Sequence, residues 1–440
     1  MTMQDITPLF GESGDFNAET VPIGGQAVGL CYLDGVCSSE ELNRDILGPL
    51  MRGAPPALFA HHSVKRPDTA DQAAKLLIGG HALLFFPGQE QPYAYEVKGF
   101  PARGIAVPQG ENVIKGARDA FGETLRLNTG LVRRKIGAPE LRFRELVVGY
   151  RSQTRVAVVY LEGHTPPDSV EEVTQRLEAL SGQTDGALTS AIVEEVLCGS
   201  TVSPFPRLQF GERTDRFCIE VLSGRVGVLI DGLCVAYTLP ATLPRLMRAA
   251  EDFSLNSFVA SVITLLRYFA LTVSVALPGG FLAVALYHQE MIPYKMVRTM
   301  LNGRAQVPFP TFVELFFMII VFEVIIEAGI RMPGTFGGAV SIVGGLVMGQ
   351  AAVMANFVSP VTVIIVAFTG IAGFTSPNQD FAYAARFLRI LMIPLCLWLG
   401  LFGLAVGMMV LIWHLAGIVV CGVPYLSGGS VLRLPYGRKV

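Results

Sequence analysis

Charged side chains are scarce in the second half of this sequence. Of its 70 charged residues, 14 lie between Tyr268 and Val440, and the 48 residues from Met332 to Gln379 contain none. An apolar run of about 20 residues is long enough to cross the hydrocarbon of a bilayer, so this stretch predicts two crossings. The scarcity of charge therefore indicates a polar N-terminal part followed by a membrane domain.

Other absences exclude whole classes of function. The formal net charge is −2 and no basic run occurs, so nucleic acid is not expected as a partner. The acidic, polar N-terminus differs from a signal peptide, which predicts that the N-terminal half stays in the cytosol. The 7 cysteines show no metal-ligand spacing, and we expect reduced thiols, no bound metal and no cofactor. Since no catalytic triad, Cys-His pair or P-loop lysine stands out, we predict that the protein is not an enzyme.

Two similar passages in the polar half indicate an internal duplication. Val28–Leu33 and Val156–Leu161 each predict a strand that ends in an acidic residue and a glycine before a capped helix. Further along, Ala82–Phe86 and Val226–Ile230 each follow a glycine-containing turn and predict a hairpin strand. We therefore predict two copies of a small α/β subdomain, with chance resemblance between short apolar strands as the alternative.

The predicted fold class is α+β, joined to an α-helical membrane domain of about five segments. The first α/β subdomain is expected over residues 1–110, a charged connecting helix over 111–139 and the second subdomain over 140–250. The transmembrane domain follows over 251–425, and a short C-terminal tail over 426–440.

The segment from Asn112 to Ile136 is dense in arginine, aspartate and glutamate. One interpretation is a solvated connecting helix whose opposite charges pair four residues apart. The other is a clamp between subdomains or subunits, built from Arg118, Glu123 and Arg133. The spacing alone leaves both interpretations open.

The first expected membrane segments differ in their polar content. Tyr268–Tyr287 is apolar and should be broken at Pro278-Gly279-Gly280, which is tolerable where protein or water satisfies the freed backbone groups. The next segment, Thr311–Ile330, carries glutamates. It is either an amphipathic helix on the membrane surface or a span whose acidic face lines a hydrated path.

Four residues form a predicted intramembrane charge network: Glu314, Glu323, Glu327 and Arg331. The last three are spaced four residues apart and share one helical face, so the arginine can pair with at least one carboxylate. We expect this network to hold the gate of a pore or to set its electrostatics.

Gly337–Phe357 is the predicted pore helix, because small residues let helices approach closely and few polar side chains interrupt it. Ordinary packing of small residues is the alternative. The pore and gate candidates are Ser341, Gly345, Gly349, Gln350 and Asn356.

Two further apolar segments complete the predicted membrane domain. Pro360–Phe374 is the fourth, and Ile390–Trp413 is the fifth, either as one long helix or as a tight hairpin. Basic residues do not decide the orientation, because Lys295, Arg298 and Arg304 follow the first segment while Arg386 and Arg389 precede the last.

Several phrases of the sequence occur together and in order in one known family. The chain resembles the A subunit of the spore germinant receptor, the GerA family, over almost all its length. The phrases that carry the resemblance are Gly116–Glu123, Asn128-Thr129, Arg133-Arg134, Gly211–Asp215, Val307–Pro310, Glu327–Pro333, Ser341–Leu346, Gly349–Val353 and Val358–Pro360.

The resemblance implies a multi-pass subunit in the inner membrane of a bacterial spore, with its N-terminal domain on the cytosolic, spore-core side. It implies a transporter-like B subunit and a lipoprotein C subunit as partners, and a homo-oligomeric ring, a pentamer, that acts as a ligand-gated cation channel and triggers germination. A related branch, similar to the stage V sporulation protein AF, amplifies ion release instead. A membrane transporter subunit is the rival from another class, and a scaffold without conduction is a third interpretation.

The family phrases also extend the set of expected contacts between domains or subunits. This set is Arg118, Asp119, Glu123, Asn128, Arg133, Arg134, Glu212, Arg213 and Asp215. Thr214 departs from the family, which usually has proline there, and this departure predicts a less rigid loop.

Overall fold

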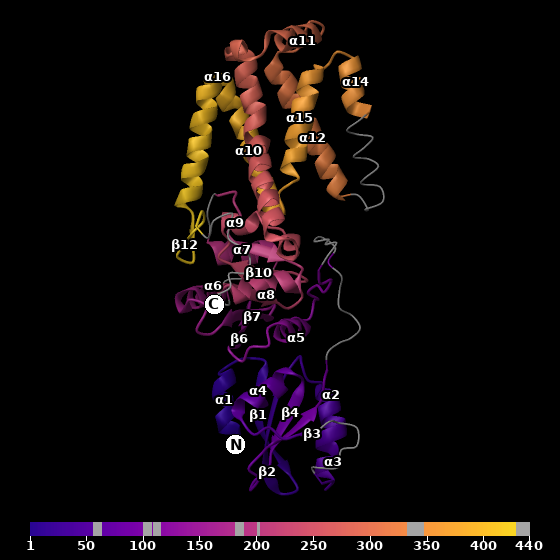
Figure 1. The fold of residues 1–440 in the computed structure, drawn as a ribbon, viewed down its shortest axis with the longest axis vertical. Coiled ribbons are helices and arrows are strands. Elements are labelled where there is room, and N and C mark those ends of the chain that lie inside the picture. The colour runs from indigo at the N-terminus through magenta and orange to yellow at the C-terminus, as the bar shows by residue number, and fades with distance from the viewer. Residues whose placement is uncertain are drawn as a thin grey trace. The chain divides into compact units, whose positions relative to one another are not determined.

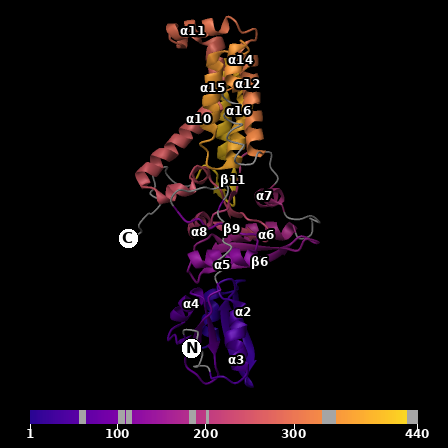
Figure 2. The ribbon, with the colours of Figure 1, turned by 90° about the vertical axis from the view of Figure 1, so that its right-hand side faces the viewer.

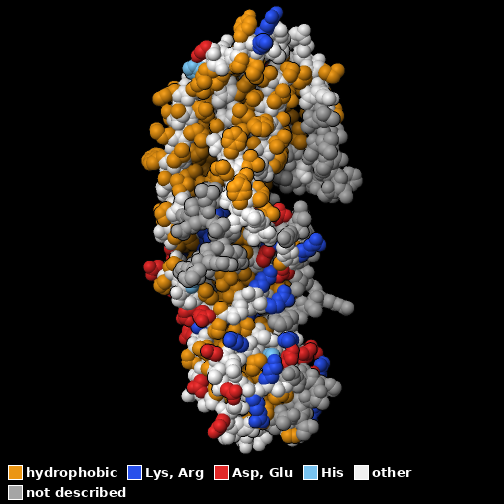
Figure 3. All heavy atoms as spheres, viewed as in Figure 1, with side chains coloured by type: hydrophobic (Ala, Val, Ile, Leu, Met, Phe, Trp, Pro, Cys, Tyr) orange, Lys and Arg blue, Asp and Glu red, His pale blue; other side chains and the backbone are white. Residues whose placement is uncertain are grey.

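The computed structural model describes residues 1–55, 64–99, 108, 116–180, 189–199, 203–331 and 347–427. Contacts divide the chain into two units. The α/β unit comprises Met1–Thr201, Arg207–Ala241 and Val419–Val423, and the helical unit comprises Val202–Pro206, Thr242–Ile418 and Pro424–Val440. The surfaces of the two units differ in composition: Figure 3 shows charged side chains on the α/β unit and apolar side chains over the visible face of the helical unit.

The first half of the α/β unit is an antiparallel sheet in the order β1-β2-β4-β5-β3, with helices on both faces (Figure 1). Its strands are β1 (Phe16–Ile23), β2 (Gln26–Leu33), β3 (Val64–Lys65), β4 (His81–Phe85) and β5 (Tyr93–Glu96). Its helices are α1 (Met3–Phe10), α2 (Ser39–Glu41), the π-helical turn Leu42–Leu47, α3 (Gly48–Met51) and α4 (Ala70–Ile78).

Strand β4 explains why this sheet needs two helical layers. Leu83 packs with the residues of α1 and α4, whereas Ala82 and Leu84 pack with the π-helical turn on the other face. All three are fully buried. Because successive strand residues point to opposite faces, a continuous apolar run predicts a sheet covered on both sides.

The second half repeats this order in β6-β7-β9-β10-β8. Its strands are β6 (Leu141–Val148), β7 (Thr154–Leu161), β8 (Gln209–Gly211), β9 (Val226–Ile230) and β10 (Ala236–Leu239). Its helices are α5 (Leu125–Lys135), α6 (Pro167–Ala179), α7 (Ser190–Cys198) and α8 (Thr214–Leu222). The duplicated topology that the sequence predicted is therefore present, and α5 occupies the place in the second copy that α1 occupies in the first.

The position of α5 corrects its interpretation as a solvated connector. Leu125, Val132 and Ile136 belong to the core of the second copy, together with residues of β6, β7 and α8. The part of the charged segment that forms α5 is thus the first helix of the second subdomain, and burial of one of its faces supplies its stability.

The helical unit is built from longer helices (Figures 1 and 2). They are α9 (Leu243–Leu246), the 3₁₀ turn Ala250–Ser254, α10 (Ser257–Tyr287), the 3₁₀ turn Gln289–Met291, α11 (Tyr294–Arg304), α12 (Thr311–Arg331), α14 (Gly349–Met354), α15 (Pro360–Gly373) and α16 (Gln379–Gly417). Two short strands follow, β11 (Val419–Val420) and β12 (Val423–Pro424). In the described part of the chain, α10 and α16 are long and apolar enough to cross a membrane. The five predicted crossings are not confirmed.

Helix α10 runs through the point where the sequence predicted a break. It continues past Pro278, and an added Cβ on Gly279 would lie 2.7 Å from the Cys396 sulfur of α16. The glycine therefore serves close helix packing rather than interruption of the helix.

Helix α16 is a hairpin, which decides between the two predicted alternatives. Gly400 breaks it with φ 59° and ψ −141°. An added Cβ on Gly407 would lie 2.5 Å from the Met392 sulfur. Since fifteen residues of straight helix would separate these positions by about 22 Å, the chain must reverse between them.

Candidate functional site

A buried arginine joins the two copies of the α/β unit. Arg133 of α5 has no exposed surface, and its Nε and Nη2 donate to the two carboxylate oxygens of Asp15, each at 2.8 Å. Asp15 precedes β1 in the first copy and also accepts from Ser13 Oγ at 2.6 Å. The Arg133 guanidinium donates further to the carbonyl oxygens of Ala138 and Leu141, at 3.1 and 3.0 Å. A buried ion pair is tolerated when its remaining donors are satisfied in this way.

A second contact between the copies depends on two glycines. Gly35, at φ +82°, turns the chain after β2, and an added Cβ on Gly130 of α5 would lie 2.3 Å from the Gly35 carbonyl oxygen. Beside them, Arg126 bridges Glu145 at 2.7 Å and Asp34 at 3.2 Å. Burial raises the pKa of Glu145 above its ordinary value, and the Arg126 charge opposes this shift.

The remaining predicted contact residues hold the second copy together. Asn128 exchanges two hydrogen bonds of 2.8 Å with the backbone of Gly122, which fixes the chain entering α5. Arg213 pairs with Asp215 at 2.5 Å, and the backbone of Phe121 donates to Glu212. Arg118 and Glu123 are exposed, and no side-chain partner is found for them among the described residues. Of the predicted clamp, Arg133 alone lies at the joint.

Thr214 stiffens the loop that was predicted to be less rigid. Its hydroxyl donates to the Asp119 carboxylate at 2.7 Å, and its backbone N–H, which a proline would lack, donates to the Asp119 carbonyl. Lys135 also contacts Asp119 at 2.9 Å, and Arg134 lies 3.9 Å away. Burial alone would raise the pKa of Asp119, but the bonds from Thr214 and Lys135 outweigh burial and hold this pKa below its ordinary value.

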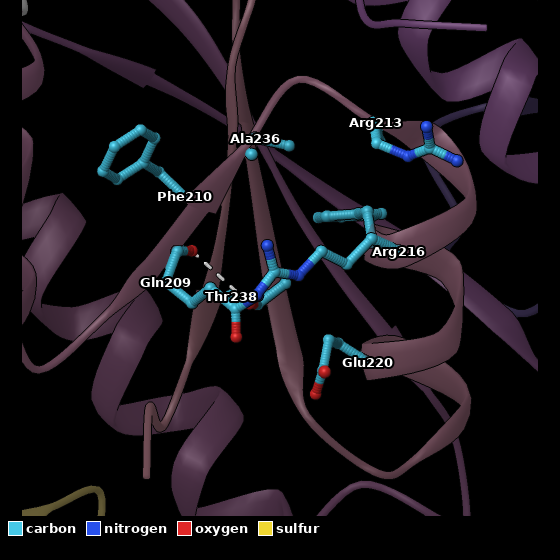
Figure 4. A pocket seen from close by; sticks show the side chains of 9 residues that line it. Gln209, Phe210, Arg213, Arg216, Glu220, Ala236 and Thr238 are labelled. Carbon is cyan, nitrogen blue, oxygen red and sulfur yellow. Dashed lines mark hydrogen bonds between the residues drawn. The ribbon is translucent and has the colours of Figure 1, made fainter. Parts of the chain in front are cut away.

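A shallow hollow between α8, the edge strand β8 and its neighbour β10 contains three charged side chains (Figure 4). Its cavity volume is about 10 Å³, far below the roughly 300–1,000 Å³ of ordinary ligand pockets. Glu220 pairs with Arg225 at 3.1 Å, and Arg213 is engaged with Asp215. Figure 4 shows Arg216 extended toward Gln209 and Thr238. The hollow is therefore too small, and its charges too well paired, for a ligand site.

The predicted charge network of α12 has partners on another helix. Glu323 accepts from Arg389 of α16, and Arg386 lies 3.9 Å away, so two arginines share one carboxylate. Arg386 also stands over the rings of Tyr383 and Phe374. Glu323 thus links α12 to α16, a contact between helices that the spacing within α12 did not predict. The Arg331 side chain lies outside the described residues.

Glu314 has a local role that its spacing did not reveal. Its side chain is 1% exposed and accepts a hydrogen bond from the backbone N–H of Ser359, at the start of α15. Ser359 Oγ in turn accepts from the backbone of Thr362 at 3.4 Å. Since the N-terminus of a helix carries partial positive charge, a carboxylate there stabilises α15.

The pore candidates are described in part. Ser341 and Gly345 lie outside the described residues. Gly349 and Gln350 open α14, where Gln350 is exposed, and Asn356, at φ +54°, forms the exposed turn before α15. The structure brings none of these three described residues into contact with the charge network of α12.

Residues 203–206, here called the strap, were missed by sequence reasoning. The chain on either side of the strap belongs to the α/β unit, whereas the strap itself belongs to the helical unit. Phe205 is 5% exposed, and its ring centroid lies 5.5 Å from that of Phe381 and 5.9 Å from that of His414. Ser203 Oγ lies 2.8 Å from His414 Nε2. Because Phe381 begins α16 and His414 ends it, Phe205 contacts both ends of the hairpin.

The signal for the strap is its phrase Ser203-Pro-Phe-Pro206, which repeats the Pro-Phe-Pro of residues 308–310. Proline fixes its own φ and restricts the residue before it to extended conformations, so flanking prolines present the phenylalanine on stiff backbone. A systematic search for this repeat would have found the strap.

Comparison with known proteins adds to this geometry. Residues 4–435 match the model of the Bacillus/Clostridium GerA spore germination protein family. An uncharacterized membrane protein of Bacillus subtilis, YfkQ, is 35% identical over 92% of this chain and 81% of its own length. Spore germination protein B1 of the same species is 32% identical over 96% of this chain and 90% of its own length.

A solved structure, the N-terminal domain of the A subunit of the Bacillus megaterium spore germinant receptor GerK3, is 22% identical with a TM-score of 0.41. The match covers 54% of this chain and 92% of that one. From the family match along nearly its whole length, and from relatives above 30% identity, the chain belongs to the GerA family of spore germination proteins.

Proposed function

We propose that the chain acts in spore germination as a receptor A subunit, whose α/β domain controls membrane helices that open as a ligand-gated cation channel. In this proposal the subunits form a ring in the spore inner membrane, with the N-terminal domain on the core side. A transporter-like B subunit and a lipoprotein C subunit are the partners. Membership of the GerA family supports the role in germination.

The strap is the observation that carries the proposed coupling. A receptor subunit needs a physical path from the domain that meets its partners to the helices that conduct. The strap leaves the α/β unit, places Phe205 against both ends of the α16 hairpin and returns to the α/β unit. Displacement of the strap would therefore act on two helix ends together. A ligand can use this path only if it binds the open state more tightly than the closed state.

The proposed pore is lined by Ser341, Gly345, Gly349, Gln350 and Asn356. The exposure of Gln350 in the single chain suits a residue that faces a space shared between subunits. Arg118 and Glu123, exposed on the second α/β copy, are proposed as contacts between neighbouring subunits.

Purified chain in liposomes tests the conduction. We expect ohmic cation current that Gly345→Leu abolishes, because a bulky ring of side chains would fill the opening. Gly417→Leu is the matched control, since an added Cβ at Gly417 meets nothing within 4 Å. Saturable, substrate-coupled flux would contradict the channel and indicate a transporter. Absence of any flux would indicate a scaffold without conduction.

Spores that carry the whole receptor test the coupling. Phe205→Ala should slow the germination response to nutrient by at least about tenfold at unchanged protein level, since 1.4 kcal/mol of lost coupling is one decade. Phe258→Ala, which removes a phenylalanine that is 77% exposed, is the control. An unchanged response in Phe205→Ala spores would remove the strap from the mechanism.

A further inference from the structure

Helix α11 is an amphipathic helix that has few buried contacts of its own. Successive helical residues advance by 100°, so Met296, Val297, Met300 and Leu301 fall on one half of α11 and Lys295, Arg298, Thr299 and Asn302 on the other. Arg304, in the last turn, falls on the apolar half. None of its residues is fully buried. Figures 1 and 2 both show α11 lying across the end of the helical unit instead of along its helices.

Large apolar side chains in and just before α11 are exposed to an unusual degree. Tyr294 is 80% exposed, Met296 57% and Leu301 58%, and Met291 just before the helix is 63% exposed. Single exposed apolar residues need no explanation, but four within eleven positions form a patch that water does not favour.

The charges of α11 have one sign. Lys295, Arg298 and Arg304 are its charged residues, and among the described residues none of the three has an ion-pair partner. The neighbouring carboxylate, Glu290, lies outside the helix and is 3.3 Å from His288 Nδ1. Three cations without counter-ions beside an apolar patch match the interface of an anionic bilayer, which offers negative charge at its surface and an apolar interior.

The connections of α11 restrict where that surface lies. Six residues separate it from the end of α10 and six from the start of α12. Six residues reach at most about 20 Å, so α11 stays close to the ends of both apolar helices. If α10 crosses a bilayer, α11 must then lie at the interface where α10 emerges.

We propose that α11 lies in the membrane interface and binds anionic phospholipid headgroups through Lys295 and Arg298, the two cations of its polar half. Its apolar half enters the boundary of the acyl chains while the basic side chains extend to the phosphates. If the N-terminal domain is cytosolic and α10 crosses the bilayer once, α11 lies on the opposite side, and the bias of cytoplasmic loops toward lysine and arginine does not account for these cations. The proposal requires no conduction and stands or falls separately from the channel.

The first test measures lipid retained by the full chain in mixed phosphatidylcholine and phosphatidylglycerol, by mass spectrometry of the purified protein. We expect selective retention of phosphatidylglycerol, and at least about tenfold weaker selectivity in the variant Lys295→Gln and Arg298→Gln. The matched control replaces two exposed cations of the α/β unit by glutamine, at Arg151 and Arg155. Equal selectivity in both double variants would overturn the proposal.

The second test measures the depth of α11 without removing charge. With Trp398 and Trp413 replaced by phenylalanine, Leu301→Trp should be quenched by lipids brominated on their acyl chains, and Thr299→Trp should be quenched several-fold less. Quenching of both or neither would overturn the interfacial placement. Protection of the Leu301→Trp indole from both brominated lipid and aqueous acrylamide would instead mean that a protein surface, such as a second copy, covers α11.

Discussion

Two buried arginines, one in each unit of the molecule, differ in how many of their hydrogen-bond donors have a partner. Arg133 in the α/β unit donates through all three of its nitrogens to Asp15, Ser13 and two carbonyl groups. Arg389 in the helical unit bonds to Glu323 through one nitrogen, and its buried Nε has no partner within the described part of the chain. Glu323 is moreover shared with Arg386.

The difference separates a fixed joint from an adjustable one. A fully satisfied buried network has one good arrangement, so the two α/β copies should move as a single body. Glu323 has a second arginine, Arg386, 3.9 Å away, so we expect the contact between α12 and α16 to be able to change its partner. The first joint transmits movement and the second is suited to permit it.

Loss of the fixed joint should have the largest effect. Arg133→Met leaves Asp15 buried and uncompensated, which should lower the free energy of unfolding of the α/β unit by about 3–5 kcal/mol. Chemical denaturation of the full chain in detergent, followed by circular dichroism, measures this loss. Arg134→Met, at a position 38% exposed, is the control and should cost far less. Equal stability of the two variants would contradict the fixed joint.

Removal of the Glu323 charge, which Arg389 and Arg386 share, should lower stability less than loss of Arg133. Glu323→Gln keeps an acceptor for Arg389 but removes the charge from the bond, a change of about 1.5–3 kcal/mol. Hydrogen exchange in detergent should quicken in α12 and in the first half of α16, while α10 near Ser257 changes little. Unchanged exchange in all three helices would show that the Glu323 carboxylate does not stabilise the contact between α12 and α16.

Disruption of the glycine contact beside the fixed joint should have a smaller effect on stability than loss of Arg133. Gly130→Ala places a methyl group against the Gly35 carbonyl, and forced overpacking costs about 1–3 kcal/mol. Gly137→Ala is the matched control because its nearest neighbour would lie at 3.6 Å. If thermal unfolding of Gly130→Ala follows that of Gly137→Ala, the close approach of the two copies is not required.

Acid should weaken the second α/β copy slightly through Asp119. Its pKa is lower in the folded state than in the unfolded state, so its contribution is present above the ordinary value of 3.8 and disappears as pH falls through the folded pKa. Asp119→Asn should therefore be less stable near neutral pH and should lose less stability on acidification. A parallel pH dependence of wild type and variant would refute this assignment.

Local patterns of the sequence predicted the α/β copies well. Val226–Ile230 was expected as a strand and is one, since an apolar run bounded by a glycine turn needs no distant partner to be recognised. The duplication followed from the same local signals.

Pairings across the chain could not be predicted in this way. Arg389 is 66 positions from Glu323, and Asp15 is 118 from Arg133, so neither spacing points to its partner. The spacing predicted only that Arg331 could pair with at least one carboxylate of its own helix, because helical periodicity shows only neighbours on the same helix. The sequence did not decide between a hairpin and one long helix for a related reason. Gly400 is one of 47 glycines, and only its positive φ distinguishes it.

The reversal at Gly400 has a topological consequence if the α16 hairpin enters a bilayer. The hairpin then adds an even number of passes, so the chain leaves on the side from which it came. Tyr425 and Asn378 then share one compartment whatever the arrangement of the earlier helices. Excision of the hairpin would leave the sidedness of every remaining segment unchanged, whereas straightening it at Gly400 would invert the compartment of everything that follows.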